Sequence, residues 1–183
     1  MAENFVYFDL ETQRSSNDVG GWDYKADMKM SVGVTYSTAR QGYTIYDESN
    51  VQELIDELVA ADLVIGFNHI NFDYEVLMGY TILDLKQQTR NLDLMLVLKK
   101  ELEHRPKLDA VAAATLHHGK TAVGTDAIKW WREGKIMQIA EYCCFDVKVT
   151  KMVHEYGAEH GQVAYTNRYN QTLEIPVCWR LPD

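Results

Sequence analysis

Acidic side chains occur in three short segments that could together bind metal ions. Asp9 and Glu11 lie in FVYFDLET, Asp73 lies in GFNHINFDYEVL, and Asp146 lies in YCCFDVKVT, four residues after Tyr142. Carboxylate oxygens are ligands that Mg²⁺ and Mn²⁺ prefer, and two such ions about 3.5–4 Å apart can activate a water and stabilise a departing alkoxide. We therefore expect a site for two divalent cations, Mg²⁺ or Mn²⁺, that acts on phosphodiesters.

The first pair of acids lies in a segment with the composition of a strand. Residues 5–11 are rich in aromatic and branched side chains. Because side chains two apart on a strand share a face, Asp9 and Glu11 point the same way. An unpaired charge in a central strand is costly, and a bound cation removes that cost. The alternative is a strand end that emerges into solvent with Glu11 exposed.

The third acid follows a short apolar strand, which we expect over residues 63–68. In α/β sheets, ligand sites gather beyond the carboxyl ends of the strands, where Asp73 would lie near the start of a helix. The alternative is that Asp73 only caps this helix. His69, in the same segment, would either contact a phosphate or occupy a surface loop.

Tyr142 and Asp146 are spaced i, i+4 and share one face of a helix. Ile139, Val149 and Val153 lie on the same stripe, and an acid on an apolar stripe either has a partner or binds something. The alternative is a partly exposed helix edge with a Tyr–Asp contact. A phenol with a pKa near 10 is a poor base at neutral pH, but it could orient an attacking water.

The elements that must position these residues indicate an α/β fold with a mixed sheet. Three antiparallel strands are followed by a helix, a parallel strand and further helices, and the chain ends in a hairpin expected over residues 162–180. A polar segment, 12–27, is expected to be a loop, and Asn50 is expected to cap the first long helix. Strands are expected at 5–11, 30–38, 43–48 and 63–68, and helices at 51–61, from 72, and at 92–103, 107–117 and 135–157.

Length and composition indicate one domain over residues 1–183, with a core of about 5–157. The net charge of −9 argues against a broad basic surface for long duplex DNA. We find no apolar run long enough to span a membrane and no secretory signal, so we expect a cytoplasmic protein. Three cysteines without zinc-ligand spacing are expected to be reduced, packed thiols.

A basic and aromatic segment, 117–135, is a candidate contact for single-stranded nucleic acid. It contains Lys120, Lys129, Trp130 and Arg132, and cations beside aromatic rings suit phosphate contact and base stacking. Trp22, in the expected loop after the first strand, could also approach the substrate. The alternative is that the tryptophans pack into the core and the cations form a solvated face.

Taken in order, the three acidic segments resemble the motifs of DEDD-type 3′→5′ exonucleases of the ribonuclease H-like superfamily. FDLET resembles the first motif and supplies Asp9 and Glu11, GFNHINFDYEVL resembles the second and supplies Asp73, and YCCFDVKVT resembles the third in its tyrosine form. In that form Asp146 is the fourth acid and Tyr142 orients the water. The chain is similar to ribonuclease H-like domains found alone or attached to bacterial and archaeal helicases.

This resemblance implies a mixed five-stranded sheet, with its first three strands antiparallel, and a two-metal site. It implies that Asp9 and Asp146 hold the ion carrying the nucleophilic water, that Glu11 shares this ion, and that Asp9 bridges to the second ion. Asp73 would act through water, and Asn68 of the second motif would contact substrate. The implied substrate is a single-stranded 3′ end that releases nucleoside 5′-monophosphates, with a helicase or polymerase as a candidate partner.

Two other functions fit the same residues at this point. One is an endonuclease acting on structured or RNA–DNA hybrid nucleic acid, because the superfamily includes ribonuclease H. The other is a non-catalytic nucleic-acid-binding module, which has no need for this much buried negative charge. DNA or RNA preference, processivity, pathway and oligomeric state stay open.

Overall fold

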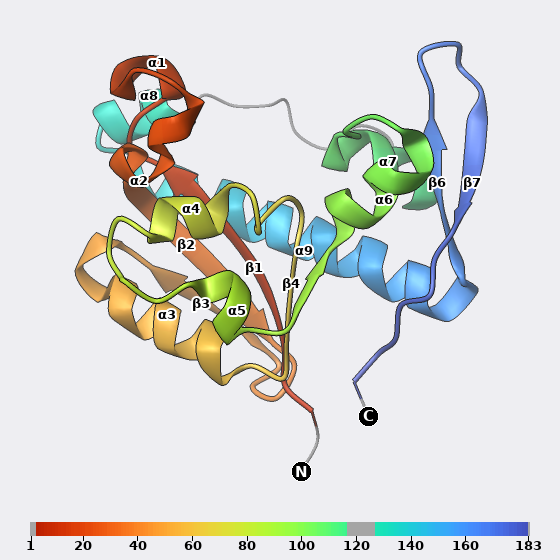
Figure 1. Cartoon of the computed structure of the whole chain (residues 1–183), viewed down its shortest axis with the longest axis horizontal. Coiled ribbons are helices and arrows are strands. Elements are labelled where there is room, and N and C mark those ends of the chain that lie inside the picture. The colour runs from red at the N-terminus through yellow and green to blue at the C-terminus, as the bar shows by residue number, and fades with distance from the viewer. Residues whose placement is uncertain (1–2, 117–126, 183) are drawn as a thin grey trace.

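The computed structural model describes residues 3–116 and 127–182, with a mixed five-stranded sheet at its centre (Figure 1). The strand order is β3-β2-β1-β4-β5, in which β1 is antiparallel to β2 and parallel to β4. The expected α/β fold and the expected antiparallel arrangement of the first three strands are thus confirmed. The strands are β1 (Phe5–Thr12), β2 (Met30–Ser37), β3 (Gly42–Tyr46), β4 (Leu63–Gly66) and β5 (Asn91–Asp93).

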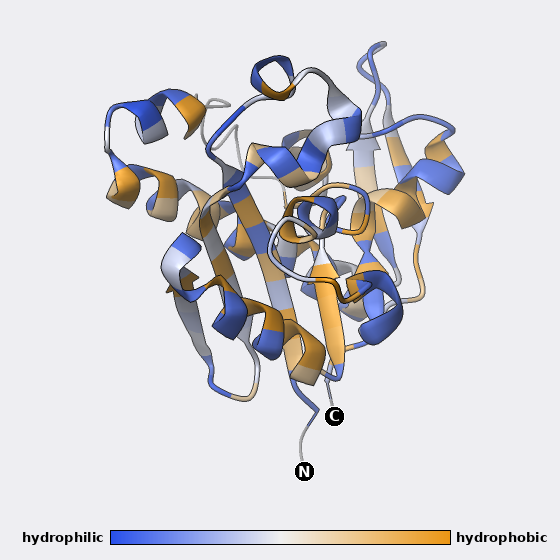
Figure 2. Cartoon of the chain, turned by 60° about the vertical axis from the view of Figure 1, so that its left-hand side comes forward, coloured by the Kyte–Doolittle hydropathy of each residue, from blue (hydrophilic) through white to orange (hydrophobic). Residues whose placement is uncertain are grey.

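Helices cover both faces of this sheet, and hydrophobic and hydrophilic residues alternate along them (Figure 2). They are α1 (Ser16–Val19), α2 (Lys25–Met28), α3 (Val51–Ala60), α4 (Asp73–Leu77), α5 (Leu85–Gln88), α6 (Leu94–Leu102), α7 (Leu108–Leu116), α8 (Ala127–Arg132) and α9 (Ile136–His160), with the short 3₁₀ helices η1 (Trp22–Tyr24) and η2 (Glu48–Asn50).

Strand β1 divides the buried apolar residues into two clusters. Because successive side chains on a strand point to opposite faces, Val6 and Phe8 pack with residues of α3, α4 and α5. Phe5 and Tyr7 pack on the other face with residues of α6, α7 and α9. Asp9 continues that second face, so the fold directs an acid toward α9.

A two-stranded hairpin follows α9, as predicted. It consists of β6 (Gln162–Thr166) and β7 (Thr172–Pro176), which pair in antiparallel register. The buried side chain of Thr115 on α7 fixes the hairpin, since its hydroxyl donates to the Ala164 carbonyl at 3.1 Å and accepts from the Ala164 amide at 3.0 Å. The hairpin is therefore held by the body of the fold.

Two expected boundaries are wrong because local caps override the sequence pattern. The segment 12–27 is not a simple loop, since Ser15 and Asp18 form a capping box that starts α1. Helix α9 does not end near Gly157 but continues to His160 and is capped by Gly161 at φ +71°. Gly157 thus lies inside the helix, where Trp179 packs against it and leaves no room for a side chain.

Two further local expectations also differ. Asn50 makes no side-chain cap for α3; instead, Asp47 caps η2, and the Asn50 side chain accepts the Asp47 amide at 2.8 Å. The fifth strand, β5, is only three residues long and falls where the pattern indicated the start of a helix. Asp93 ends this strand and caps α6, accepting the Leu96 amide at 3.2 Å.

No helix in residues 3–116 and 127–182 is long and apolar enough to cross a membrane. Cys143, Cys144 and Cys178 are free thiols rather than disulfides. Cys143 is buried and Cys144 is partly buried against the apolar core, whereas Cys178 is exposed. The expectation of packed thiols is therefore confirmed for the first two and wrong for Cys178.

Candidate metal centre

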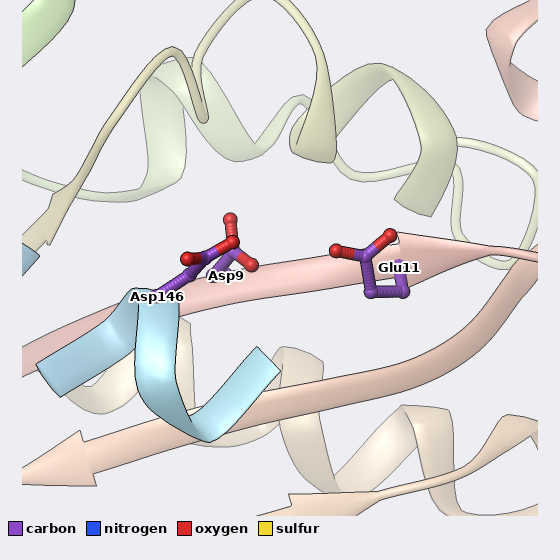
Figure 3. Close-up of side chains that lie close together, drawn as sticks. All are labelled: Asp9, Glu11 and Asp146. Carbon is purple, nitrogen blue, oxygen red and sulfur yellow. The ribbon is translucent and has the colours of Figure 1, made fainter. Parts of the chain in front are cut away.

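Three of the four expected acids converge at the carboxyl-terminal half of β1 (Figure 3). Asp9 and Glu11 on β1 and Asp146 on α9 each offer a carboxylate oxygen, and these oxygens lie within 4.8 Å of one another. All three side chains are partly exposed. Carboxylate oxygens at this spacing fit a hard divalent cation such as Mg²⁺ or Mn²⁺.

The sheet register explains why this end of β1 is open. Strand β4 pairs with β1 only from Phe5 to Tyr7, so the following residues of β1 extend beyond the end of β4. On the other side β1 still pairs with β2, with Asp9 opposite Val34 and Glu11 opposite Val32. This part of β1 therefore pairs with a strand on one edge only, with a register shift after Glu11, and its other edge makes no strand pairing.

Asp73 occupies that free edge and lies outside the group of three oxygens. Its Oδ1 accepts the Leu10 amide at 3.0 Å, in the place where a neighbouring strand would supply a carbonyl. The cap of α4 is Phe72, which makes no side-chain capping bond. Asp73 therefore links α4 to β1 between Asp9 and Glu11, with one carboxylate oxygen bonded to the backbone.

Burial and neighbouring negative charges raise the pKa of all four acids. Desolvation is the largest cause in each case: it raises the pKa of Asp9 well above its usual value, that of Glu11 to about 8, that of Asp73 to about 7 and that of Asp146 to about 6. The charges of Asp73, Asp146 and Glu11 raise the pKa of Asp9 further. A bound cation would offset this repulsion and displace the protons.

Tyr142 lies beside Asp146, as the i, i+4 spacing predicts. A hydrogen bond between the two side chains lowers the pKa of Asp146, while burial and the neighbouring carboxylates raise the pKa of Tyr142 far above its usual value. The phenol therefore stays protonated. The ring of Trp130 on α8 meets the Tyr142 ring edge-on, with 6.2 Å between centroids.

Two further groups influence the acids without having been predicted, one by contact and one by its charge. The Cys143 thiol donates to the Asp9 carbonyl at 3.3 Å and lies 3.4 Å from Asp9 Oδ2. The charge of Asp109 on α7 raises the pKa of Asp146. The sequence could have indicated Cys143, because it directly follows Tyr142. It could not have indicated Asp109, which becomes a neighbour of Asp146 only when α7 packs against α9.

The connection between β4 and α4 is a buried polar network. Asp93 accepts the Asn68 amide at 2.8 Å and the Ile70 amide at 3.2 Å. His69 is fully buried and pairs through Nε2 with Asn91 at 3.1 Å, so it neither lies on the surface nor contacts phosphate. Asn68 has φ +71°, and its Oδ1 is buried without a hydrogen-bond partner among the described residues.

The expected substrate contacts lie in two places near the acids. Trp22 in η1 is 64% exposed, and its ring lies 6.3 Å from that of Phe72, which precedes Asp73. Arg132 at the end of α8 pairs with both carboxylate oxygens of Asp18 in α1, at 3.0 and 2.9 Å. This ion pair joins α8 to the helical segment after β1.

The other residues of the basic and aromatic segment 117–135 differ in exposure. Lys129 is exposed on α8, whereas Trp130 and Trp131 are partly buried against the apolar cluster. The position of Lys120 lies outside the described residues. The structure thus brings Trp22, Trp130 and Arg132 to the same side of the molecule, with α1, α2 and α8 together in Figure 1.

Part of the chain is similar to a known protein family. Residues 84–174 match a family described as "Predicted 3′-5′ exonuclease related to the exonuclease domain of PolB". This match includes Tyr142 and Asp146 but begins after the first two acidic segments, so it covers neither Asp9 and Glu11 nor Asp73. No curated protein matches the sequence.

Two solved structures share the fold at low sequence identity. A family B DNA polymerase from the hyperthermophilic archaeon Pyrobaculum calidifontis is 14% identical over 85% of this chain, with a TM-score of 0.61. The zinc-bound E. coli ExoI–ssDNA complex is 13% identical over 87% of this chain, with a TM-score of 0.53. The chain spans only 24% and 41% of those two proteins. These similarities show a shared α/β fold, and the tyrosine subclass stays a prediction.

Proposed function

We propose that this chain is a metal-dependent 3′→5′ exonuclease that hydrolyses single-stranded DNA or RNA and releases nucleoside 5′-monophosphates. The observation that carries the proposal is the convergence of Asp9, Glu11 and Asp146 within 4.8 Å at the open end of β1. The similarity of residues 84–174 to an exonuclease family supports the same reaction. We propose that residues 1–183 form one such domain.

Asp9, Glu11 and Asp146 would hold two divalent cations, Mg²⁺ or Mn²⁺, with Asp73 contributing through water. When bound, such ions supply charge for a nucleophilic water and for the departing alkoxide. Asp73 keeps this part of β1 in place through its bond to the Leu10 amide. The Cys143 thiol restrains Asp9 through its contacts with the carbonyl and the carboxylate of that residue.

Tyr142 would orient the attacking water rather than accept its proton. Its raised pKa keeps the hydroxyl protonated, and its bond with Asp146 places that hydroxyl beside the carboxylate. Trp130 limits the movement of the Tyr142 ring by packing against its edge. The tyrosine subclass of DEDD exonucleases, which the sequence resembles, is thus our proposed assignment.

The substrate strand would contact aromatic and basic groups beside the acids. The exposed Trp22 ring next to Phe72 suits base stacking, and Asn68, Lys129 and Arg132 are further candidate contacts. The similarity to E. coli ExoI, which was solved in complex with ssDNA, supports a single-stranded substrate. The similarity to a DNA polymerase makes a polymerase a candidate partner, beside a helicase.

A time course on 5′-end-labelled single strands tests the proposal. DNA and RNA of equal sequence are incubated with Mg²⁺, Mn²⁺ or chelator and separated on a denaturing gel. We expect a metal-dependent ladder that shortens from the 3′ end. Cleavage of a circular single strand would instead identify an endonuclease, and intact substrate in every lane would contradict a nuclease.

A matched pair of variants separates the site from general effects of charge. Asp146→Asn removes a proposed ligand, whereas Asp109→Asn removes a neighbouring acid outside the group of three oxygens. We expect the first variant to lose cleavage and the second to keep most of it. Equal activity of the two variants would refute the assignment of Asp146.

A further inference from the structure

A pocket of about 540 Å³ lies between the hairpin and the end of α6, away from the acids. Its walls come from the turn after α6 and from β6, β7 and the tip that joins them. Figure 1 shows this hairpin on the opposite side of the molecule from α1, α2 and α8. The lining residues are Glu101, Leu102, His104, Tyr165, Asn167, Arg168, Tyr169 and Leu173.

The pocket is already shaped by hydrogen bonds on both of its sides. His104 Nδ1 lies 2.8 Å from the Leu102 carbonyl and must carry a hydrogen, since a carbonyl only accepts. His104 Nε2 then pairs with the Tyr165 hydroxyl at 3.1 Å. At the hairpin tip, Asn167 Oδ1 accepts the amides of Tyr169 and Gln171 at 2.9 and 3.0 Å.

The two tyrosines differ in exposure, since Tyr165 is partly buried against the apolar core and Tyr169 faces solvent. Tyr169 is 68% exposed, and the Arg168 guanidinium lies 4.8 Å from the centre of its ring. Leu173 is also exposed, and the Tyr165 ring lies 5.4 Å from that of His104. An exposed tyrosine fixed by a turn loses little conformational freedom when a flat ligand stacks on it.

The chemistry of the pocket fits a nucleobase with its phosphate. The rings of Tyr165 and Tyr169 offer flat apolar faces, Arg168 offers donors to a phosphate, and Glu101 offers an acceptor for an amino group. An acidic peptide would not suit Glu101, and a purely apolar partner would desolvate the charge of Arg168.

The start of the hairpin lies at a distance from the acids that one strand can cover. Asp146 and His160 are 14 residues apart on α9, which corresponds to about 21 Å at 1.5 Å per residue. The hairpin begins directly after this helix. At about 3.4 Å per stacked nucleotide, a strand whose 3′ end lies at the acids reaches the hairpin after roughly six nucleotides.

We propose that the pocket between α6 and the hairpin binds a nucleotide of the same single strand, upstream of the 3′ end at the acids. This inference rests on the proposed exonuclease function for the placement of the 3′ end. Tyr169 stacks on the base, and Arg168 contacts a phosphate. The chain would accordingly favour strands that are long enough to occupy both sites.

Binding and cleavage of two strand lengths test this proposal. A strand of about 12 nucleotides reaches the hairpin and a trinucleotide does not. Binding is measured with labelled strands in chelator, where the proposed reaction does not proceed, and cleavage is measured separately with Mg²⁺. We expect Tyr169→Ala and Arg168→Ala to weaken binding of the longer strand about tenfold and to raise its KM without changing trinucleotide cleavage.

Control variants distinguish stacking from a general loss of an exposed tyrosine. Tyr169→Phe keeps the ring and should bind the longer strand like the wild type. Tyr43→Ala removes a tyrosine that is 44% exposed on β3, the strand at the far edge of the sheet, and should also leave binding unchanged.

Unchanged affinity for the longer strand in both Tyr169→Ala and Arg168→Ala would overturn the proposal. A protein partner would then be the alternative occupant of the pocket. Because binding is measured without the reaction, this result is distinct from a failure of the exonuclease function. If the wild type binds the longer strand but cleaves nothing, and both variants lose this binding, the result would support the pocket and contradict the exonuclease function.

Discussion

Strand β1 and helix α9 meet at two places, and the two contacts have opposite character. At one, Asp9 and Glu11 face Asp146, and burial raises the pKa of each acid. At the other, Tyr7 pairs with His154 Nδ1 at 2.9 Å, and burial lowers the pKa of His154 to about 4. The same pair of elements thus gathers charge at one end and excludes it at the other.

The second contact is closed by the chain's C-terminal segment. The Trp179 ring stacks on His154 with 5.8 Å between centroids and lies against Gly157, leaving no room for a side chain there. Among the described residues, no comparable packing covers the three acids, whose side chains are partly exposed. We infer that the acidic contact lowers stability in exchange for cation binding, whereas the neutral contact stabilises the fold.

The largest expected effect concerns Asp146. Replacing Asp146 with Asn removes a proposed cation ligand and should reduce cleavage by a factor on the order of 10²–10³. It also removes repulsion with Asp9 and Glu11, so the midpoint of thermal unfolding should stay the same or rise. Gel assays and thermal unfolding in chelator measure the two quantities. A variant that unfolds at a lower temperature would show that the acids stabilise the fold.

The next effect is a pH dependence at the neutral contact. His154 has a pKa of about 4 when folded and about 6.5 when unfolded, so the unfolded chain binds the proton more readily. Above pH 6.5, His154 does not lower the free energy of unfolding. As the pH falls from 6.5 to 4, His154 lowers the free energy of unfolding increasingly, by at most about 3 kcal/mol.

Urea unfolding at several pH values, compared between the wild type and His154→Gln, checks this prediction. The acids contribute the same background in both proteins, so the difference between the two isolates His154. We expect the free energy of unfolding of the variant to fall less steeply below pH 6.5. Parallel pH profiles would show that His154 is not held neutral.

A smaller effect is expected where Trp179 meets α9. An added Cβ at position 157 would lie 2.4 Å from Cε3 of Trp179, so Gly157→Ala should lower the free energy of unfolding by about 1–3 kcal/mol. Cleavage by the folded variant should be unchanged, because the acids lie at the other contact. Combining it with Trp179→Leu should recover part of the loss, and additive losses would argue against this clash.

The smallest effect concerns Tyr142. Tyr142→Phe keeps the ring that packs against Trp130 and loses the hydroxyl, so the cleavage rate should fall about tenfold, as expected for one hydrogen bond. Tyr156→Phe, on the same helix, is the control and should cleave like the wild type. A loss as large as that of Asp146→Asn would mean that the tyrosine does more than orient water.

The sequence by itself determined the α/β class and the acids on β1 and α9. Alternation along β1 places Asp9 and Glu11 on one face, and i, i+4 spacing places Tyr142 beside Asp146. These relations follow from the periods of single elements. They could be predicted from the sequence because each depends on residues close in the chain.

Packing between distant elements decided the rest. The bond of Asp73 to the Leu10 amide depends on where β4 stops pairing with β1, and the contact of Cys143 with Asp9 depends on how α9 crosses the sheet. The absence of room for a side chain at Gly157 depends on Trp179, which packs against α9 there. Such features join residues far apart in the chain, so neither periodicity nor motif spacing could specify them.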